Sequence, residues 1–361
     1  MTYYVLGTMS GSSLDGLDLV HANISLNGGK WEFEINHTES ITYTQDWKNK
    51  LKNAANLQGF DLIHLDREYA KWVAEQINTF VQKHDLVYNI HLIGHHGHTV
   101  FHAPDKGFTF QLGSGAEIAA ITGYPTVTNL RDMDVALGGQ GAPIIPMVEK
   151  HLFPGYAAYI NLGGICNISL VKKNEIQAYD LSFCNQLLNY FAEKKALEMD
   201  KGGALAADGE INQEALNALR AIPYLQEDGC KSLSNSALNT WLQHLEHLSI
   251  EDALATSVQH ICETIIQNLS VHLDPRMEQR VLLSGGGTKN SFLVNTLQAA
   301  IKEQQENIEF IIPEEEIIDY KEALGMAFLA VLRWREEDTV EAINSGASRD
   351  SIGGALWLGS H

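Results

Sequence analysis

Three turns rich in glycine and small polar residues carry the residue types from which phosphate-binding sites are built. They are GTMSGSSLDGLD (residues 7–18), NLGGICN (161–167) and SGGGTKN (284–290), and each follows an apolar run typical of a strand. Glycine lets the backbone approach an anion closely, and the N–H groups of such a turn can bind phosphate oxygens. A single turn of this kind is more often a plain connection between strands, whereas three in one chain favour nucleotide binding.

The first turn also carries hydroxyl and carboxylate groups. Hydroxyls can donate hydrogen bonds to phosphate oxygens, and a nearby carboxylate can hold Mg²⁺ through its water shell. A turn or cap role is an equally good interpretation of Asp15 from spacing alone. None of the three turns has the Gly-Lys-Ser/Thr of a Walker A loop or the G-x-G-x-x-G of a dinucleotide fold. The polar side chains of the first turn are Thr8, Ser10, Ser12, Ser13, Asp15 and Asp18.

The elements around these turns predict an α/β fold with a duplicated mixed β-sheet core. Residues 3–6, 20–26 and 31–35 have the patterns of strands, and Asn27-Gly28-Gly29 between the last two predicts a hairpin turn. The order strand, glycine turn, strand, hairpin, strand recurs about 150 residues later, over residues 159–180. Further strands are expected at 92–93, 281–283 and 308–312, and helices at 69–81, 254–269 and 323–334.

Length and composition indicate a two-lobed enzyme. A chain of 361 residues exceeds what one hydrophobic core usually supports. We expect an N-terminal lobe over residues 1–135, completed by the C-terminal helix, and a C-terminal lobe over residues 136–361. The formal net charge of −20 disfavours nucleic-acid binding. No membrane span or secretory signal is evident, and four scattered cysteines without a C-x-x-C pair favour a reducing cytoplasm.

At this point the motifs resemble those of a known family. GTMSGSSLDGLD is similar to the opening of the anhydro-N-acetylmuramic acid kinases, in which threonine usually stands at the place of Ser12. GHHGHT (94–99) resembles the family's G-S-H-G-Q-T, with histidine replacing serine and glutamine. The resemblance continues in order through residues 131–134, GGQGAPIIP (138–146), NLGGICN, SGGGTKN and EALGMAF (322–328).

The resemblance implies a fold, a reaction and a set of ligands. The fold would be the two-lobed actin-like ATPase (ribonuclease H-like) fold of sugar kinases and Hsp70, which clamps ATP between lobes. The reaction would open the 1,6-anhydro bridge of anhydro-N-acetylmuramic acid with water and phosphorylate O6 with ATP and Mg²⁺. A cytoplasmic homodimer acting in peptidoglycan recycling is implied as well. The nucleotide would lie on Gly11, Ser12, Ser13, Asp15, Gly16, Asn161, Gly163, Gly164, Asn167, Gly285, Gly286, Gly287 and Asn290, and the metal on Asp15 and Asp18.

The chemistry of an anhydro sugar requires one carboxylate facing the anomeric carbon. O6 carries no proton because it is bonded to C1, so the proton to be removed is on the water that attacks C1. The family's base lies in a D-x-G-P-x-N block, which corresponds here to residues 180–185, so the resemblance assigns Asp180 as the base. A strand-end cap is the alternative role. Ser182-Phe183 replaces the family's Gly-Pro, which implies either a differently supported backbone or an altered substrate preference.

Four residues at family motif positions are expected to line the sugar site: His96, Arg131, Asp134 and Glu322. Arg131 could pair with the lactyl carboxylate of a muramyl sugar, and Glu322 could equally be a first-turn helix acid. The histidines around His96 could suggest a metal site, but no acids follow them at regular spacing. The family's K-S-T-G-R-E block persists only as Lys231-Ser232, so the role of its arginine is in doubt here.

Two other functions remain open on the sequence. The first is a kinase for a different anhydrosugar or amino sugar on the same fold, which the Ser182-Phe183 departure motivates. The second is a nucleotide-dependent clamp that transfers no phosphoryl group. We expect no peptide-binding β-domain after the core, which disfavours the clamp, and retention of Asp180, Asp15 and all three glycine turns disfavours a kinase-like chain without activity.

Overall fold

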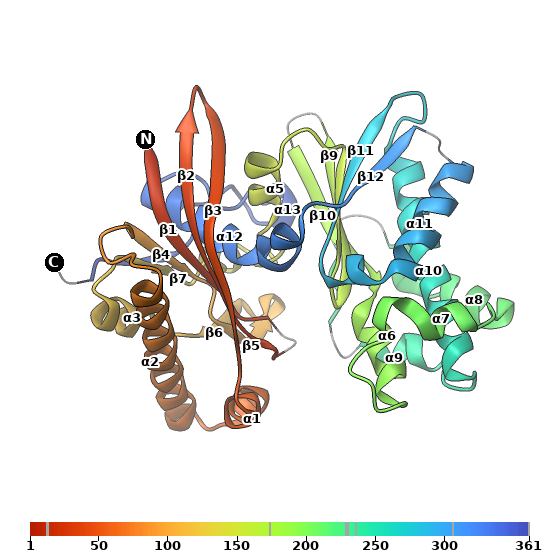
Figure 1. Ribbon diagram of the computed structural model, residues 1–361, viewed down its shortest axis with the longest axis horizontal. Helices are drawn as coiled ribbons and strands as arrows, with labels where there is room; N and C mark the ends of the chain where they lie inside the picture. Colours follow the sequence, from red (N-terminus) through yellow and green to blue (C-terminus); the bar gives the residue numbers. More distant parts are fainter. Residues whose placement is uncertain (12–13, 173–174, 228–230, 235–236, 305–306, 360–361) are drawn as a thin grey trace. The chain divides into compact units, whose positions relative to one another are not determined.

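The structure is a computed structural model that describes the chain apart from residues 12–13, 173–174, 228–230, 235–236, 305–306 and 360–361 (Figure 1). It divides into two compact units, one formed by Met1–Pro154 with Tyr320–His361 and the other by Gly155–Asp319. The sequence placed the boundary after residue 135 and predicted that the C-terminal helix completes the first lobe. In the structure residues 136–154 belong to the first unit as well, and so do residues 320–361, so the chain passes between the units twice.

The first unit is built on a six-stranded sheet with the order β13-β7-β4-β1-β2-β3. β2 pairs antiparallel with both β1 and β3, whereas β1, β4 and β7 are parallel neighbours and β13 is antiparallel to β7. A separate hairpin joins β5 (His98–Ala103) and β6 (Phe108–Leu112). The sheet strands are β1 (Thr2–Met9), β2 (Gly16–Asn27), β3 (Lys30–Thr42), β4 (Leu92–His95), β7 (Thr126–Thr128) and β13 (Ala355–Trp357).

The second unit repeats this arrangement. Its sheet has the order β10-β9-β8-β11-β12, with β8, β9 and β10 antiparallel and β8, β11 and β12 parallel. Both sheets therefore share the strand order 3-2-1-4-5, which is the ribonuclease H-like arrangement of actin-like ATPases. The expected duplication is confirmed. The strands are β8 (Ala158–Leu162), β9 (Ile165–Lys172), β10 (Glu175–Phe183), β11 (Gln279–Ser284) and β12 (Ile308–Ile311).

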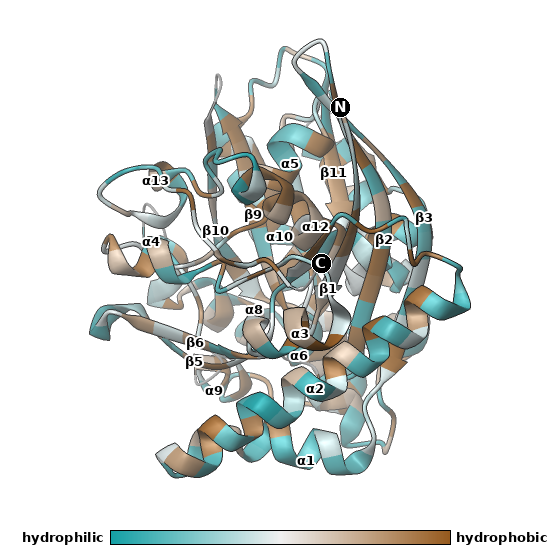
Figure 2. Cartoon of the chain, turned by 90° about the vertical axis from the view of Figure 1, so that its left-hand side faces the viewer, coloured by the Kyte–Doolittle hydropathy of each residue, from teal (hydrophilic) through white to brown (hydrophobic). Residues whose placement is uncertain are grey.

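Helices cover both faces of the first sheet. Because strand side chains alternate between faces, Val5 packs with the cluster that includes α12, whereas Leu6 packs with the cluster that includes α2. Helices α1 and α2 mix polar and apolar residues (Figure 2). The helices of the first unit are α1 (Gln45–Asn53), α2 (Gly59–Lys83), α3 (Gly115–Thr122), α4 (Asp132–Ala136), α5 (Pro146–Leu152), α12 (Glu315–Trp334), which enters this unit at Tyr320, and α13 (Ala342–Ser345).

A single hydrophobic core holds the second unit together. α10 (Ile250–His272) begins at Ser249, whose hydroxyl accepts the N–H of Asp252, and it packs against the sheet. The other helices are α6 (Asn185–Glu193), α7 (Ala204–Asp208), α8 (Gln213–Arg220), α9 (Leu238–Leu242) and α11 (Ser291–Gln304). Across the described part of the chain, no helix is long and apolar enough to span a bilayer.

Helix α12 lies directly on the backbone of the first sheet. Gly7 of β1 and Gly94 of β4 are register partners. A Cβ at Gly7 would lie 1.9 Å from the carbonyl oxygen of Ala323, and one at Gly94 would lie 2.1 Å from that of Met326. Only glycine permits this approach, so the EALGMAF segment and the first glycine turn depend on each other.

Replacing Gly7 with alanine should therefore destabilise the protein by about 1–3 kcal/mol or more, because the helix must move off the sheet. Equilibrium urea unfolding measures the change. Gly59→Ala is the matched control, because Gly59 begins α2 and a Cβ there would meet no atom of the described residues within 4 Å. Equal stability of the two variants would contradict the proposed dependence.

Candidate active site

Polar residues from two distant segments meet at one edge of the first sheet. β1 and β4 are parallel neighbours, so their carboxyl ends lie side by side. The hydroxyl oxygen of Thr8 is 2.6 Å from Nδ1 of His95, and that of Ser10 is 3.1 Å from Nδ1 of His98. All four side chains are buried. The first glycine turn and the GHHGHT segment thus form one polar cluster.

A chain of buried hydroxyl groups continues from Ser10 into the unit. Tyr43 donates to the Ser10 hydroxyl at 2.8 Å, and the Tyr43 and Tyr69 hydroxyls are 2.6 Å apart. Because the Tyr43 proton points to Ser10, the Tyr69 hydroxyl donates to Tyr43. Burial raises the pKa of Tyr43 to about 12, so its phenol remains a neutral donor. These contacts hold the start of the first turn in place.

The rest of the first turn is described only in part. Ser12 and Ser13 lie outside the described residues. Asp15 is exposed, whereas Asp18 is half-buried and its Oδ1 accepts the Ser40 hydroxyl at 2.6 Å. A Cβ at Gly16 would lie 2.3 Å from the carbonyl oxygen of Ile41, so packing against β3 already requires glycine there.

The buried His96 pairs with the half-buried Arg131. Arg131 Nε donates to His96 Nε2 at 3.0 Å, so the ring proton of His96 is on Nδ1, which donates to the carbonyl oxygen of Gly97 at 2.8 Å. Burial, reinforced by the Arg131 charge, holds the pKa of His96 well below its usual value. Burial also lowers the pKa of Arg131 to about 10, opposed by the charges of Glu322 and Asp134. The pair therefore presents a neutral imidazole and a charged guanidinium.

Asp134 holds a loop together. Its Oδ2 accepts the N–H of Gly141 at 2.7 Å, and its Oδ1 accepts the Ser345 hydroxyl at 2.5 Å. A Cβ at Gly139 would lie 2.3 Å from Oδ2. Both carboxylate oxygens are thus engaged inside the first unit, a role that the sequence did not predict for this residue.

In the second unit the second and third glycine turns pack on each other. β8 and β11 are parallel, and Ser284 is the register partner of Asn161. A Cβ at Gly285 would lie 2.3 Å from Oδ1 of Asn161, and one at Gly287 would lie 2.7 Å from Cβ of Leu162. Asn185, at the start of α6, donates from Nδ2 to the carbonyl oxygen of Leu162 at 2.9 Å. The glycines at 285 and 287 permit this close contact.

Strand register places four polar residues in one row across the second sheet. Ser284 lies opposite Asn161, Asn161 opposite Asn167, and Asn167 opposite Asp180. Directly opposite residues share a face and lie close together. The sheet therefore connects the third turn, the second turn and the expected base. Asn290 lies outside this row, and its Oδ1 accepts the N–H of Leu293 at 3.1 Å at the start of α11.

Asp180 is held by one oxygen. Oδ2 accepts the N–H of Leu233 at 2.8 Å and the Ser232 hydroxyl at 3.2 Å, while the Asp180 carbonyl accepts the Tyr224 hydroxyl at 3.0 Å. Among the residues that the structure describes, none donates to Oδ1. Burial raises the pKa of Asp180, and the bonds from Leu233 and Ser232 partly offset this. The sequence missed Tyr224 and the Leu233 N–H, although the persistence of Lys231-Ser232 pointed to this segment.

A β-bulge lies next to Asp180. The pairing of β10 with β9 shifts between Asp180 and Ser182, which leaves Leu181 as the extra residue. Bulges bend a strand and re-aim a neighbouring side chain. Ser182 and Phe183 are 1% and 0% exposed, respectively. Of the two interpretations of Ser182-Phe183, this burial supports a differently supported backbone.

With this geometry established, comparison with known proteins identifies the family. The family model described as anhydro-N-acetylmuramic acid kinase matches residues 3–359. The chain belongs to the anhydro-N-acetylmuramic acid kinase family. Relatives of that name include a Hydrogenovibrio crunogenus protein, 33% identical over 98% of this chain and 97% of its own. Others are from Synechococcus elongatus, 32% identical over 92% and 93%, and Haemophilus influenzae, 32% identical over 91% of each.

Within this family member, the buried histidines should make folding sensitive to acid. Burial lowers the pKa of His95 and of His260 from 6.5 to about 4. As pH falls below about 6.5, these histidines become protonated in the unfolded chain but stay neutral in the folded chain. The free energy of unfolding therefore decreases between about pH 6.5 and 4. At pH 5 each such histidine should lower the free energy of unfolding by about 2 kcal/mol relative to pH 7.5.

Urea unfolding at the two pH values measures this loss. In the His95→Asn variant, an amide that does not titrate takes the place of Nδ1 beside Thr8. The free energy of unfolding should therefore fall less steeply with decreasing pH. His64→Gln, at an exposed position on α2, should leave it unchanged. A His95→Asn protein with the pH dependence of the parent chain would refute the assignment.

Proposed function

We propose that this chain is an ATP-dependent kinase that opens the 1,6-anhydro ring of anhydro-N-acetylmuramic acid and phosphorylates O6. The products are N-acetylmuramic acid 6-phosphate and ADP, and the setting is peptidoglycan recycling. The observation that carries the proposal is Asp180: a half-buried carboxylate with Oδ2 held by two donors and Oδ1 given none by the described residues. It stands in the family's base block, on a chain that matches the family over residues 3–359.

Asp180 acts as the general base. A water molecule attacks C1 of the sugar, the C1–O6 bond breaks, and the water proton passes to Oδ1 of Asp180. O6, released from C1, attacks the γ-phosphorus, and ADP leaves with the electrons of the bond that breaks. The pKa of Asp180, raised by burial, makes its carboxylate a stronger base than an exposed one.

The three glycine turns hold the nucleotide in this proposal. The first two turns bind the phosphates, and the third binds the adenosine. The residues proposed to contact ATP are those at positions 11–13, 15, 16, 161, 163, 164, 167, 285–287 and 290. In support, the second and third turns pack together beside the row that ends at Asp180. The hydrogen bond and packing found at Asn290 and Gly16 give these two residues structural roles as well.

The sugar is assigned to His96, Arg131, Glu322 and Asp134. The guanidinium of Arg131, fixed by His96 and by the carbonyl oxygen of Gly141 at 2.6 Å, suits the lactyl carboxylate. The exposed carboxylate of Glu322 can accept hydrogen bonds from sugar hydroxyls. Asp134 contributes by shaping the loop that presents Arg131 and Gly141.

Mg²⁺ would be held by Asp15 and Asp18, and when bound it offsets charge on the phosphates. One exposed and one half-buried carboxylate at the same turn fit an ion that keeps most of its water shell and takes nucleotide oxygens. Among the described residues no cluster of three histidine, cysteine or acidic side chains could hold a metal. We also propose a cytoplasmic homodimer that binds neither nucleic acid nor membranes, on the family resemblance and the charge of −20.

The reaction itself can be tested with isotopic water. Incubation with Mg-ATP and anhydro-N-acetylmuramic acid in ¹⁸O-water should yield a 6-phosphate that carries the label at C1, as mass spectrometry detects. Asp180→Asn should lower kcat by about 10²–10⁴-fold while ATP still binds. Asp66→Asn removes another carboxylate whose pKa burial raises, and it should retain activity. Absence of a phosphorylated sugar would overturn the function, and an active Asp180→Asn protein would overturn the base.

The pH dependence of turnover tests the environment of Asp180. The carboxylate is the active form, so kcat/KM should be full at high pH and fall as pH drops through the raised pKa. Ser232→Ala removes a bond that favours the carboxylate, so the acid limb should move to higher pH by about half to one unit. Ser234→Ala, an exposed neighbour, is the control. An acid limb that stays in place or moves to lower pH in Ser232→Ala would contradict this role.

A further inference from the structure

The bulge beside Asp180 is tied to helix α10 through a buried imidazole. The Ser182 hydroxyl lies 3.2 Å from Nε2 of His260, and Nε1 of Trp241 donates to the same nitrogen at 3.2 Å. Ser182, Trp241 and His260 are each 1% exposed. Three elements, β10, α9 and α10, therefore converge on a single acceptor atom.

These contacts determine the tautomer of His260. An indole N–H can only donate, so Nε2 accepts and the ring proton is on Nδ1. The Ser182 hydroxyl, facing an acceptor, donates as well. Within the described residues Nδ1 of His260 has no partner. A buried N–H without a partner costs free energy. The contribution of the ring to the fold is therefore its acceptor atom Nε2.

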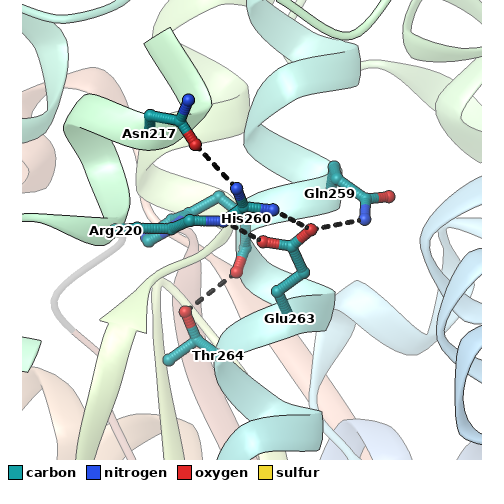
Figure 3. A network of polar contacts seen from close by, with 6 residues as sticks. All are labelled: Asn217, Arg220, Gln259, His260, Glu263 and Thr264. Carbon is teal, nitrogen blue, oxygen red and sulfur yellow. Dashed lines mark hydrogen bonds and ion pairs between the residues drawn. The ribbon is translucent and has the colours of Figure 1, made fainter. Parts of the chain in front are cut away.

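The surroundings keep His260 neutral. Figure 3 shows Arg220 from α8 forked onto Glu263, at 2.8 and 2.7 Å, with Asn217 and Gln259 completing the network beside His260. Glu263 raises the pKa of His260 and Arg220 lowers it, but burial is the largest effect and holds this pKa at about 4. The acceptor lone pair on Nε2 is thus retained at neutral pH.

A second route connects the same group to Asp180. Phe183 packs edge-on against Trp241 with ring centroids 4.9 Å apart, and Tyr224 packs against the indole at 6.3 Å. Tyr224 also donates to the carbonyl oxygen of Asp180 at 3.0 Å. The backbone before and after Leu181 is therefore held from both sides by groups that contact Trp241 or His260.

We propose that His260 is a positioning residue for the general base: by accepting the Ser182 hydroxyl it fixes the bulge that aims Asp180. The proposal rests on the assignment of Asp180 as the base of the proposed kinase. It also explains why Ser-Phe replaces Gly-Pro. Proline restricts its own backbone torsion, whereas here the strand is held from outside by a hydrogen bond at Ser182 and packing at Phe183.

The test compares variants that remove the acceptor with one that restores it. His260→Leu removes Nε2, His260→Gln places an amide oxygen near its position, and Ser182→Ala removes the donor. We expect Ser182→Ala and His260→Leu to lower kcat by about 10- to 100-fold with the KM for ATP unchanged, and His260→Gln to recover most of kcat. Ser257→Ala, which deletes a buried hydroxyl of α10 bonded at 2.6 Å to the carbonyl oxygen of Ala253, should retain full kcat.

A second measurement does not need turnover. The Asp180 carboxyl pKa can be read by ¹³C NMR on protein labelled at aspartate, with Asp180→Asn providing the assignment. Loss of positioning weakens the bonds from Leu233 and Ser232 to Oδ2, so this pKa should rise in Ser182→Ala and His260→Leu and stay in place in His260→Gln. If the parent chain phosphorylates no sugar, the proposed function is wrong. The Asp180 pKa in the parent chain and the variants still shows whether His260 positions Asp180.

The outcomes are distinct. A raised Asp180 pKa in Ser182→Ala, with recovery in His260→Gln, supports the proposal. An unchanged pKa and unchanged kcat in a folded Ser182→Ala protein overturn it. Should His260→Leu fail to fold, Ser182→Ala alone decides, because it removes only one hydroxyl.

Discussion

The contact between α12 and the bare backbone of β1 and β4 is the constraint on which the first unit depends. Gly7 and Gly94 are neighbours in the sheet, and a side chain on either would collide with a helix carbonyl. The same two strands end in the first glycine turn and the GHHGHT segment. The helix that carries the EALGMAF motif therefore packs on β1 and β4, the strands that lead into the polar cluster. It also places Glu322 within electrostatic reach of Arg131.

Ionisable groups buried inside the two units are kept neutral or paired. His95, His96 and His260 are buried with lowered pKa values, so each ring stays uncharged at neutral pH. The buried Lys321 and Glu149 of the first unit pair at 3.0 Å. Asp180 differs from these groups, because only one of its oxygens is engaged by the described residues. A carboxylate that is oriented but incompletely bonded is suited to take a proton from water.

Resemblance to a family pointed to Asp180, but it did not show which residues support the backbone beside it. The family's Gly-Pro is absent, and a serine, a phenylalanine, a tryptophan and a histidine from three elements surround the bulge in its place. A departure from a motif therefore need not be a departure in chemistry. The backbone conformation that proline restricts locally can be imposed by tertiary contacts.

The sequence by itself determined the repeated strand order, the three glycine turns and the expected position of the base, because alternation, turn residues and motif spacing are local patterns. It placed the C-terminal helix in the first lobe but not residues 136–154, whose helix α5 packs into the core of the first unit. Nor did it show that Asp134 holds a loop, that Asn290 caps a helix, or that Leu233 orients Asp180. Each of these roles arises from a hydrogen bond whose partner is fixed by the folded backbone. Ser345, which donates to Asp134, and Leu233, which donates to Asp180, lie far along the chain from those residues, where no spacing rule applies.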